Sequence, residues 1–239
     1  MDKKNIKVLI IIPAYNEEES IAEVVGRLTS QRSTYDYLII NDGSRDSTLE
    51  ICEEQHFQYL NLPINLGIGG AVQTGYVYAR RNGYDIAVQM DGDGQHDIAY
   101  LEDMLKPVLE DEADIVIGSR FLEKEGFQSS RIRRVGIKFL SFLIRLTTGK
   151  KLMDVTSGFR AVNKRFINIY ANDYPTDYPE PEAIVTAIMN RGRIMEVPVQ
   201  MREREGGSSS ITFGRSMYYM IKVTLAILVC RLSYGIRRG

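Results

Sequence analysis

The sequence is poor in the residues that build disulfide frameworks and zinc sites. Its 239 residues include only two cysteines, Cys52 and Cys230, and two histidines, His56 and His96. The cysteines lie far apart and lack metal-ligand spacing, which excludes a disulfide scaffold and favours a reducing compartment. The histidines do not form the H-x-x-x-H pattern of a helical zinc site. We expect His56 to be structural, whereas His96 follows an acidic turn and is a candidate contact to a metal or to phosphates.

Long hydrophobic runs are also missing. Near the N-terminus the apolar run at residues 8–12 is closed by Pro13, so it is too short for a signal peptide and predicts a first strand. Residues 217–229 are apolar except for Lys222 and Thr224, and these 13 residues are fewer than the ~20 that a spanning helix needs. The sequence therefore predicts a terminal helix at 216–232 that lies in a membrane surface, docks on a partner or second subunit, or is buried.

The formal net charge is −1, which gives no reason to expect nucleic-acid binding. The cations are nevertheless unevenly spread, because residues 131–151 and the chain after Phe213 contain no acidic residue. This local excess predicts an anionic surface or an anionic substrate near the C-terminal half.

Two common nucleotide-binding motifs are absent or incomplete. No G-x-x-x-x-G-K-[ST] sequence occurs, which excludes a P-loop NTPase. The glycine-rich residues 67–71 match half of a dinucleotide fingerprint, but Val72 stands where the third glycine is required. This loop also follows the third predicted strand and not the first, which argues against a Rossmann oxidoreductase.

Short apolar runs alternate with segments of helical periodicity along most of the chain. This alternation predicts an α/β fold with an open, mostly parallel central sheet and helices on both of its faces. The predicted strands are 8–12, 37–40, 57–60, 84–90, 114–118, 156–162 and 194–199. The predicted helices are 17–28, a helix capped by Asp46 or Ser47 that runs through Cys52, 67–81, 98–110, a basic amphipathic helix at 131–148, 181–191 and 216–232.

An acidic turn follows the fourth predicted strand. Asp91 and Asp93 are separated by Gly92, so their carboxylates can converge on one hard cation while the glycine lets a bulky ligand approach. A solvated acidic turn is the alternative explanation. The polar segments at 13–17 and 41–44 also follow predicted strands, and ligands of such sheets bind at the carboxyl ends of the strands. We therefore expect all three segments to face one crevice.

Seven short motifs occur along roughly residues 7 to 211. They are P-A-Y-N-E, N-D-G-S, N-x-G-x-G-G-A, D-G-D-G-Q, G-S-R, D-V-T-S-G-F-R-A and R-E-x-x-G-x-S, in that order. Each motif alone is weak, but the ordered set resembles the family 2 glycosyltransferases of the GT-A fold. Within that family the resemblance points to the dolichyl- and polyprenyl-phosphate sugar synthases.

The resemblance implies an inverting sugar transfer from a nucleotide-diphosphate sugar, linked to UDP or GDP, with Mg²⁺ or Mn²⁺ as cofactor. It implies a GT-A catalytic domain at 1–212, followed by a C-terminal apolar helix and basic tail at 213–239. The implied acceptor is a polyprenyl phosphate, and the implied location is the cytoplasmic face of a membrane. A transfer to a sugar hydroxyl during polysaccharide synthesis is one alternative. An inactive nucleotide-sugar-binding regulatory protein is another.

The same resemblance assigns roles to individual positions. The metal would be held by Asp91 and Asp93 with support from Gln95. The predicted nucleotide-binding positions are Pro13, Tyr15, Glu17, Asn41, Asp42, Gly67 and Gly69. At Asn41 the family usually has an aspartate, so the loss of a charge puts base or ribose selectivity in doubt.

Further positions concern the phosphates and the acceptor. The predicted anion contacts are Arg120, Arg131, Arg133, Arg204 and Ser209. For Arg131 and Arg133 a solvated basic face is the alternative, and Arg204 lies in a loop that could close over the donor. A hydroxyl acceptor would require a general base, for which Asp177, Glu180 and Glu182 are candidates. A proline-flanked helix start with capping acids is the other interpretation of those three. Asp154 is expected to position the acceptor or to order its loop.

Overall fold

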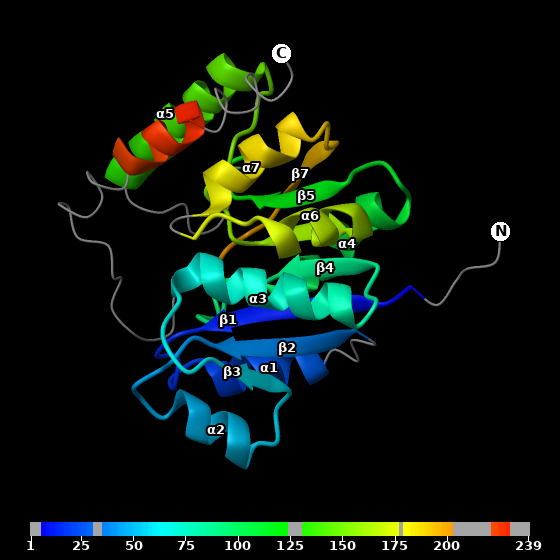
Figure 1. Cartoon of the computed structure of the whole chain (residues 1–239), viewed down its shortest axis with the longest axis vertical. Coiled ribbons are helices and arrows are strands. Elements are labelled where there is room, and N and C mark those ends of the chain that lie inside the picture. The colour runs from blue at the N-terminus through cyan, green and yellow to red at the C-terminus, as the bar shows by residue number, and fades with distance from the viewer. Residues whose placement is uncertain (1–5, 31–34, 124–130, 177–178, 203–220, 230–239) are drawn as a thin grey trace.

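The structure is a computed structural model that describes residues 6–30, 35–123, 131–176, 179–202 and 221–229 (Figure 1). Within these residues the centre is a seven-stranded sheet with the order β3-β2-β1-β4-β6-β5-β7. The strands are β1 (Val8–Ala14), β2 (Asp36–Asn41), β3 (Tyr59–Asn61), β4 (Ile86–Gln89), β5 (Ile115–Ser119), β6 (Arg160–Asn163) and β7 (Ile194–Pro198). All seven predicted strands are present, with ends shifted by a few residues.

The sheet is mostly parallel, as the sequence predicts. The pairs β1–β2, β1–β4, β2–β3 and β5–β7 are parallel. The exception is β6, which lies antiparallel between β4 and β5. This reversal was not predicted, because strand direction depends on long-range pairing and not on local sequence.

Helices cover both faces of the sheet. They are α1 (Ile21–Ser30), α2 (Thr48–Glu54), α3 (Gly67–Arg81), α4 (Leu101–Leu109), α5 (Arg131–Thr148), α6 (Lys164–Asn172) and α7 (Pro179–Met189), and a short 3-10 helix, η1 (Ile98–Tyr100), precedes α4. Helix α6 was not predicted. It begins after Asn163, whose side chain accepts a hydrogen bond from the Phe166 amide, and it buries Phe166, Ile167 and Tyr170.

The continuous apolar run of β1 serves two cores at once. Leu9 and Ile11 belong to a cluster formed with α3, α6 and α7, while Ile10 and Ile12 belong to a second cluster formed with α1 and α4. Side chains alternate between the two faces of a strand, so a central strand covered on both faces needs apolar residues at every position. The strand predicted at 8–12 is therefore confirmed, and it is buried along its whole length.

The chain after residue 220 returns to α5. Residues 221–229 are helical, and Val223 and Ile227 share a hydrophobic cluster with Leu140 and Ile144 of α5 (Figure 1). Among the described residues, no helix combines the length and the apolar character needed to cross a bilayer. The rest of the predicted helix at 216–232 and the predicted domain boundary at residue 212 lie outside the described residues.

Candidate active site

The carboxyl ends of β1, β2 and β4 open into one cavity of about 790 Å³. Its lining includes most of the positions predicted to bind a nucleotide or a metal: Pro13, Tyr15, Glu17, Asp42, Gly67, Asp91 and Asp93. The expected convergence of three strand ends is therefore present. Sequence reasoning did not single out Arg45, Asn65 and Ser20, which also line the cavity. Each of them lies in a segment that follows a predicted strand, and this position in the sequence could have identified them as candidates.

The loop after β1 forms the first wall of the cavity. Asn16 has a left-handed backbone (φ 56°), and its side-chain oxygen accepts a hydrogen bond of 2.8 Å from the Arg45 amide. The Ser20 hydroxyl donates a hydrogen bond of 2.8 Å to the carbonyl of Gly92. These bonds attach the loop to the ends of β2 and β4, so the three walls are held together. Helix α1 accordingly begins at Ile21, later than the predicted residue 17.

Asp42 links the end of β2 to the start of α3. Its Oδ1 accepts a hydrogen bond of 2.7 Å from the Leu66 amide, and its carbonyl accepts one of 2.9 Å from the Asn65 side chain. Burial raises the pKa of Asp42, and hydrogen bonds from the Leu66 and Gly67 amides oppose that shift. Gly67 lines the cavity at this point with a positive φ of 78°, which glycine adopts without strain.

Asn41 and Gly69 are not among the lining residues. The Asn41 amide donates a hydrogen bond of 2.8 Å to the Asn61 side chain and accepts one from the Ser44 hydroxyl. Its side chain is buried, and its hydrogen bonds stabilise the turn that follows β2. The structure therefore does not support the prediction of a direct nucleotide contact for Asn41. Gly69 packs against a neighbouring segment, where an added Cβ would lie 2.1 Å from the Pro175 carbonyl oxygen.

Asp91 and Asp93 line the cavity directly after β4. The Asp91 carboxylate lies beside Gly158, where an added Cβ would be 2.7 Å from Oδ2 and would force the carboxylate to shift. Asp93 Oδ1 accepts a hydrogen bond of 3.1 Å from the Gln95 amide. Gln95 is not among the described lining residues, and its carbonyl accepts a hydrogen bond from the Arg202 amide.

The cavity is strongly acidic. Its described lining contains one basic residue, Arg45, and the acidic residues Glu17, Glu18, Glu19, Asp42, Asp46, Asp91 and Asp93. An anion such as a diphosphate would be repelled here unless a cation came with it. Among the described residues no group of three or more His, Cys, Asp and Glu side chains is arranged to hold a metal. A pair of carboxylates that leaves the other ligands to phosphate and water fits Mg²⁺ or Mn²⁺.

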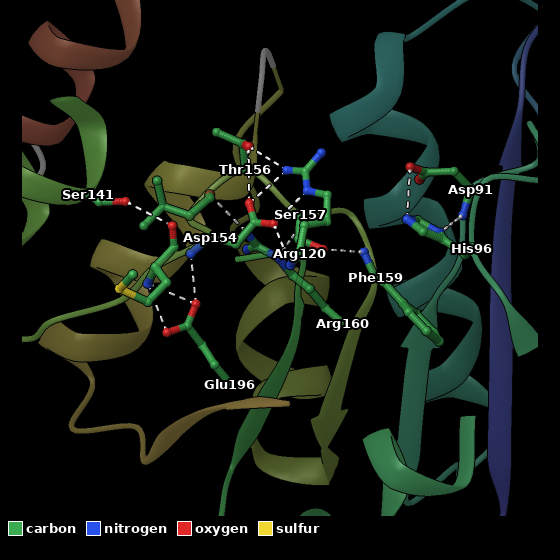
Figure 2. A network of polar contacts seen from close by, with 12 residues as sticks. Asp91, His96, Arg120, Ser141, Asp154, Thr156, Ser157, Phe159, Arg160 and Glu196 are labelled. Atoms are coloured by element: carbon green, nitrogen blue, oxygen red, sulfur yellow. Dashed lines mark hydrogen bonds and ion pairs between the residues drawn. The ribbon is translucent and has the colours of Figure 1, made fainter. Parts of the chain in front are cut away.

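His96 lies behind Asp91. Its ring is buried, stacks on Phe159 at 5.0 Å between centroids, and accepts a hydrogen bond of 3.0 Å at Nδ1 from the Asp91 amide (Figure 2). Burial lowers the pKa of His96 to about 4. The candidate role as a direct contact to metal or phosphate is therefore not supported, because the ring faces the Asp91 backbone. His56, expected to be structural, is exposed in the turn after α2.

Arg120 follows β5 and is buried with Asp154. The Arg120 guanidinium donates to both carboxylate oxygens of Asp154 and, over 2.9 Å, to the hydroxyl of Thr156 (Figure 2). The predicted contact of Arg120 to phosphate thus competes with an internal ion pair. Asp154 orders its own loop, which is one of the two roles expected for it.

Arg160 belongs to the motif D-V-T-S-G-F-R-A, but sequence reasoning did not single it out. Its buried guanidinium donates to the carbonyls of Ser157, Val155 and Glu180, at 2.8, 3.2 and 2.8 Å. These bonds hold the loop that contains Gly158 against the start of α7. Arg160 therefore shapes the wall that faces Asp91.

Two of the three candidate bases, Glu180 and Glu182, occupy the first turn of α7. Glu182 does not line the main cavity but a smaller one of about 230 Å³, which it shares with Tyr174, Thr176 and Lys222. Burial raises the pKa of Glu182, Asp173 adds to that effect, and Lys222 opposes it. Glu180 contacts Arg160 through its carbonyl and is not among the described residues that line the main cavity. Neither glutamate thus lines the main cavity, although the charges of Glu180 and Asp91 both act on the Arg120 guanidinium.

Five predicted positions have side chains outside the described part of the chain. Asp177, Arg204 and Ser209 lie outside the described residues. Arg131 and Arg133 begin α5, but their side chains are likewise outside the described part. Their roles as base candidate or anion contacts remain predictions.

Comparison with known proteins agrees with the fold and identifies the family. Residues 9–169 match the family model described as glycosyl transferase family 2. A UDP-N-acetylglucosamine–dolichyl-phosphate N-acetylglucosaminyltransferase of Methanococcus voltae is 33% identical over 90% of this chain and 94% of its own length. An undecaprenyl-phosphate mannosyltransferase of Micrococcus luteus is 32% identical over 92% of this chain and 93% of its own length.

A solved structure shows the same fold at lower sequence identity. The crystal structure of glucosyl-3-phosphoglycerate synthase from Mycobacterium tuberculosis with UDP superposes with a TM-score of 0.72 and 17% identity, over 95% of this chain and 80% of that one. The fold is therefore that of the GT-A glycosyltransferases. Taken together, the matched family model, the relatives and the fold show that this chain is a glycosyltransferase and belongs to glycosyl transferase family 2.

Proposed function

We propose that this enzyme transfers a sugar, with inversion, from a nucleotide-diphosphate sugar to a polyprenyl phosphate at a membrane surface. The observation that carries the proposal is the pair Asp91 and Asp93 in an acidic cavity that contains one basic residue, Arg45, among its described lining. Such a cavity suits a diphosphate only together with a divalent cation.

The described residues suggest where each part of the donor lies. Tyr15, Glu17 and Asp42 line the cavity and would contact the base and ribose. Asp91 and Asp93 would hold Mg²⁺ or Mn²⁺ on the diphosphate. When bound, the cation neutralises the charge that develops on the leaving diphosphate. Glucosyl-3-phosphoglycerate synthase, which shares the fold, was crystallised with Mn²⁺ and UDP-glucose, which supports this arrangement.

The acceptor is inferred from the relatives and from the position of the acids. The two relatives above are named for dolichyl phosphate and undecaprenyl phosphate. A phosphate acceptor is already an anion and needs no general base, whereas a sugar hydroxyl must lose a proton. Glu182 lines a separate cavity, and neither Glu180 nor Glu182 is among the described residues around the donor cavity. For these two glutamates the placement favours the phosphate acceptor, while Asp177 lies outside the described residues.

The proposed membrane contact is an exposed apolar face. On α5, Val135, Phe139, Phe142 and Leu146 recur at helical spacing and are 68%, 47%, 63% and 71% exposed. The neighbouring helix at 221–229 exposes Ile221, Leu225 and Val229 while it buries Val223 and Ile227 against the core. Basic residues accompany this face in a segment without acids, residues 131–151. An apolar face with flanking cations is typical of a helix that lies in an anionic membrane surface.

The activity is tested with the purified chain, Mn²⁺ or Mg²⁺, labelled UDP- and GDP-sugars, and dolichyl or undecaprenyl phosphate in detergent. We expect label to enter the organic phase with one donor, and Asp93→Ala to abolish the transfer while the fold is retained. Label that appears only in a water-soluble or butanol-insoluble product would refute the lipid acceptor. No transfer and no donor hydrolysis with any donor would refute the proposed reaction.

The membrane contact is tested by sedimentation with vesicles that contain anionic lipid. We expect Phe142→Glu with Leu146→Glu to reduce the bound fraction severalfold, because both side chains belong to the exposed apolar face. Leu109→Glu is the matched control, since Leu109 is 40% exposed at the end of α4. Equal binding by both variants would refute a membrane contact at this face.

A further inference from the structure

We infer that His96 is a positioning residue that holds Asp91 in the orientation needed to bind the cation. The inference rests on the proposed role of Asp91 as a metal ligand, and it assigns His96 no contact with the metal itself. Four observations carry it: the two nitrogens of the ring, the packing of the ring, the support of its backbone, and the position of Gly158 beside the Asp91 carboxylate.

Both ring nitrogens of His96 face Asp91 (Figure 2). Nδ1 accepts a hydrogen bond of 3.0 Å from the Asp91 amide, so the ring must carry its proton on Nε2. Nε2 lies 3.8 Å from Asp91 Oδ2, and its N–H therefore turns a positive edge toward the carboxylate. One side chain thus contacts both the backbone and the carboxylate of the same residue.

The ring cannot easily turn away from this position. It is buried and stacks on Phe159 with an angle of 18° between the ring planes. The backbone of His96 is paired with Met201 in an isolated antiparallel bridge. On either side of it, the Gln95 carbonyl accepts a hydrogen bond of 3.0 Å from the Arg202 amide, and Asp97 forms an ion pair of 3.0 Å with the Arg202 side chain.

Gly158 is a second neighbour of the Asp91 carboxylate. A Cβ on Gly158 would lie 2.7 Å from Oδ2 and 2.9 Å from Oδ1, so the space beside the carboxylate is free only because residue 158 has no side chain. The carboxylate therefore has both Gly158 and the Nε2 edge of the His96 ring beside it. A ligand confined in this way loses little freedom when it binds a cation, and residues that orient a ligand commonly change metal affinity tenfold or more.

The test uses Mn²⁺ as probe, bound to the full chain with UDP or with GDP and measured by the loss of the free-Mn²⁺ EPR signal. We expect His96→Ala to weaken Mn²⁺ binding by about tenfold to a hundredfold. His96→Asn should largely restore it, because the asparagine side chain can place an acceptor oxygen near the position of Nδ1. His56→Asn changes the only other histidine, which is exposed, and should bind Mn²⁺ like the wild type. A folded His96→Ala variant with wild-type affinity would overturn the inference.

A second measurement separates this inference from the proposed function. In the metal-free wild-type chain we expect the Asp91 amide to be protected from hydrogen exchange, and in His96→Ala we expect that protection to be lost. Fast exchange of this amide in the wild type would overturn the role of His96, and it can be measured even if His96→Ala does not fold. A protected amide in a chain that binds no Mn²⁺ with either nucleotide would instead support the orienting bond and refute the metal site.

Discussion

Arg120 and Asp154 form a buried ion pair with two parallel hydrogen bonds. Nε lies 2.6 Å from Oδ2, and Nη2 lies 2.7 Å from Oδ1. The side chains are 7% and 0% exposed, and the pair joins the end of β5 to the loop that contains Gly158. A buried charge is stable only with its partner, so the pair ties the geometry of this loop to the sheet.

Loss of the Asp154 charge should therefore destabilise the fold strongly. We expect Asp154→Asn to lower the free energy of unfolding in urea by about 3 kcal/mol, since Arg120 would remain buried without a counter-charge. Asp85→Asn is the matched control, because it removes an exposed partner of Lys164 and should have little effect. Equal effects of the two substitutions would show that burial does not set the strength of the Arg120 pair.

The contact between Gly158 and Asp91 predicts a loss of activity without a loss of fold. A Cβ at residue 158 would push against both carboxylate oxygens of Asp91. We expect Gly158→Ala to lower kcat/KM at least tenfold, or about 1.4 kcal/mol of transition-state stabilisation. The control is Gly26→Ala, because Gly26 lies in α1 and an added Cβ there has nothing within 4 Å. This variant should keep its activity and raise the unfolding free energy by about 0.5–1 kcal/mol. Full activity of Gly158→Ala would refute the steric contact.

Asp114 should make the free energy of unfolding depend on pH. Burial acts to raise its pKa, but hydrogen bonds from Arg193 and Asn163 together with the charge of Arg193 outweigh burial and hold the pKa below its usual value. A lowered pKa in the folded state stabilises the protein above the unfolded-state pKa of about 3.9, and this contribution is lost as the pH falls through the folded-state value. We expect Asp114→Asn to cost about 1–2 kcal/mol at pH 7, and progressively less below about pH 4.

The measurement is urea unfolding of the wild type and of Asp114→Asn at a series of pH values from 7 downward. The difference in unfolding free energy between the two should shrink as the pH falls below 4. A difference that stays constant across the series would contradict the direction of the pKa shift.

Two buried tyrosines on the α3–α6 side of the sheet should respond differently to loss of their hydroxyls. Among the described residues the Tyr76 hydroxyl has no hydrogen-bond partner, whereas the Tyr170 hydroxyl donates one of 3.0 Å to the Ala183 carbonyl. We expect Tyr76→Phe to leave the unfolding free energy unchanged or to raise it by up to about 1 kcal/mol, and Tyr170→Phe to lower it by about 1 kcal/mol. The two rings pack against each other at 5.3 Å, so each is the control for the other. The opposite order of effects would indicate a partner for Tyr76.

Local sequence was sufficient for most of the elements. The helices predicted at 67–81 and 131–148 match α3 and α5 to the residue, because apolar periodicity and flanking loops define them without reference to the rest of the chain. The continuous run at 8–12 also identified a strand covered on both faces. The three strand ends could be placed around one cavity in advance, since the carboxyl ends of parallel strands share one edge of a sheet.

Only the tertiary structure decided how the polar residues of the site are used. Asn41 binds Asn61, His96 binds the Asp91 backbone, and Arg120 binds Asp154. A motif shows that a polar side chain stands near a strand end, but its partner is set by which segments pack beside it. For the same reason the direction of β6 and the separation of Glu182 from the main cavity could not be predicted. The sequence by itself determined the sheet, the acidic turn and the family, whereas packing between distant segments decided which side chains face the ligand.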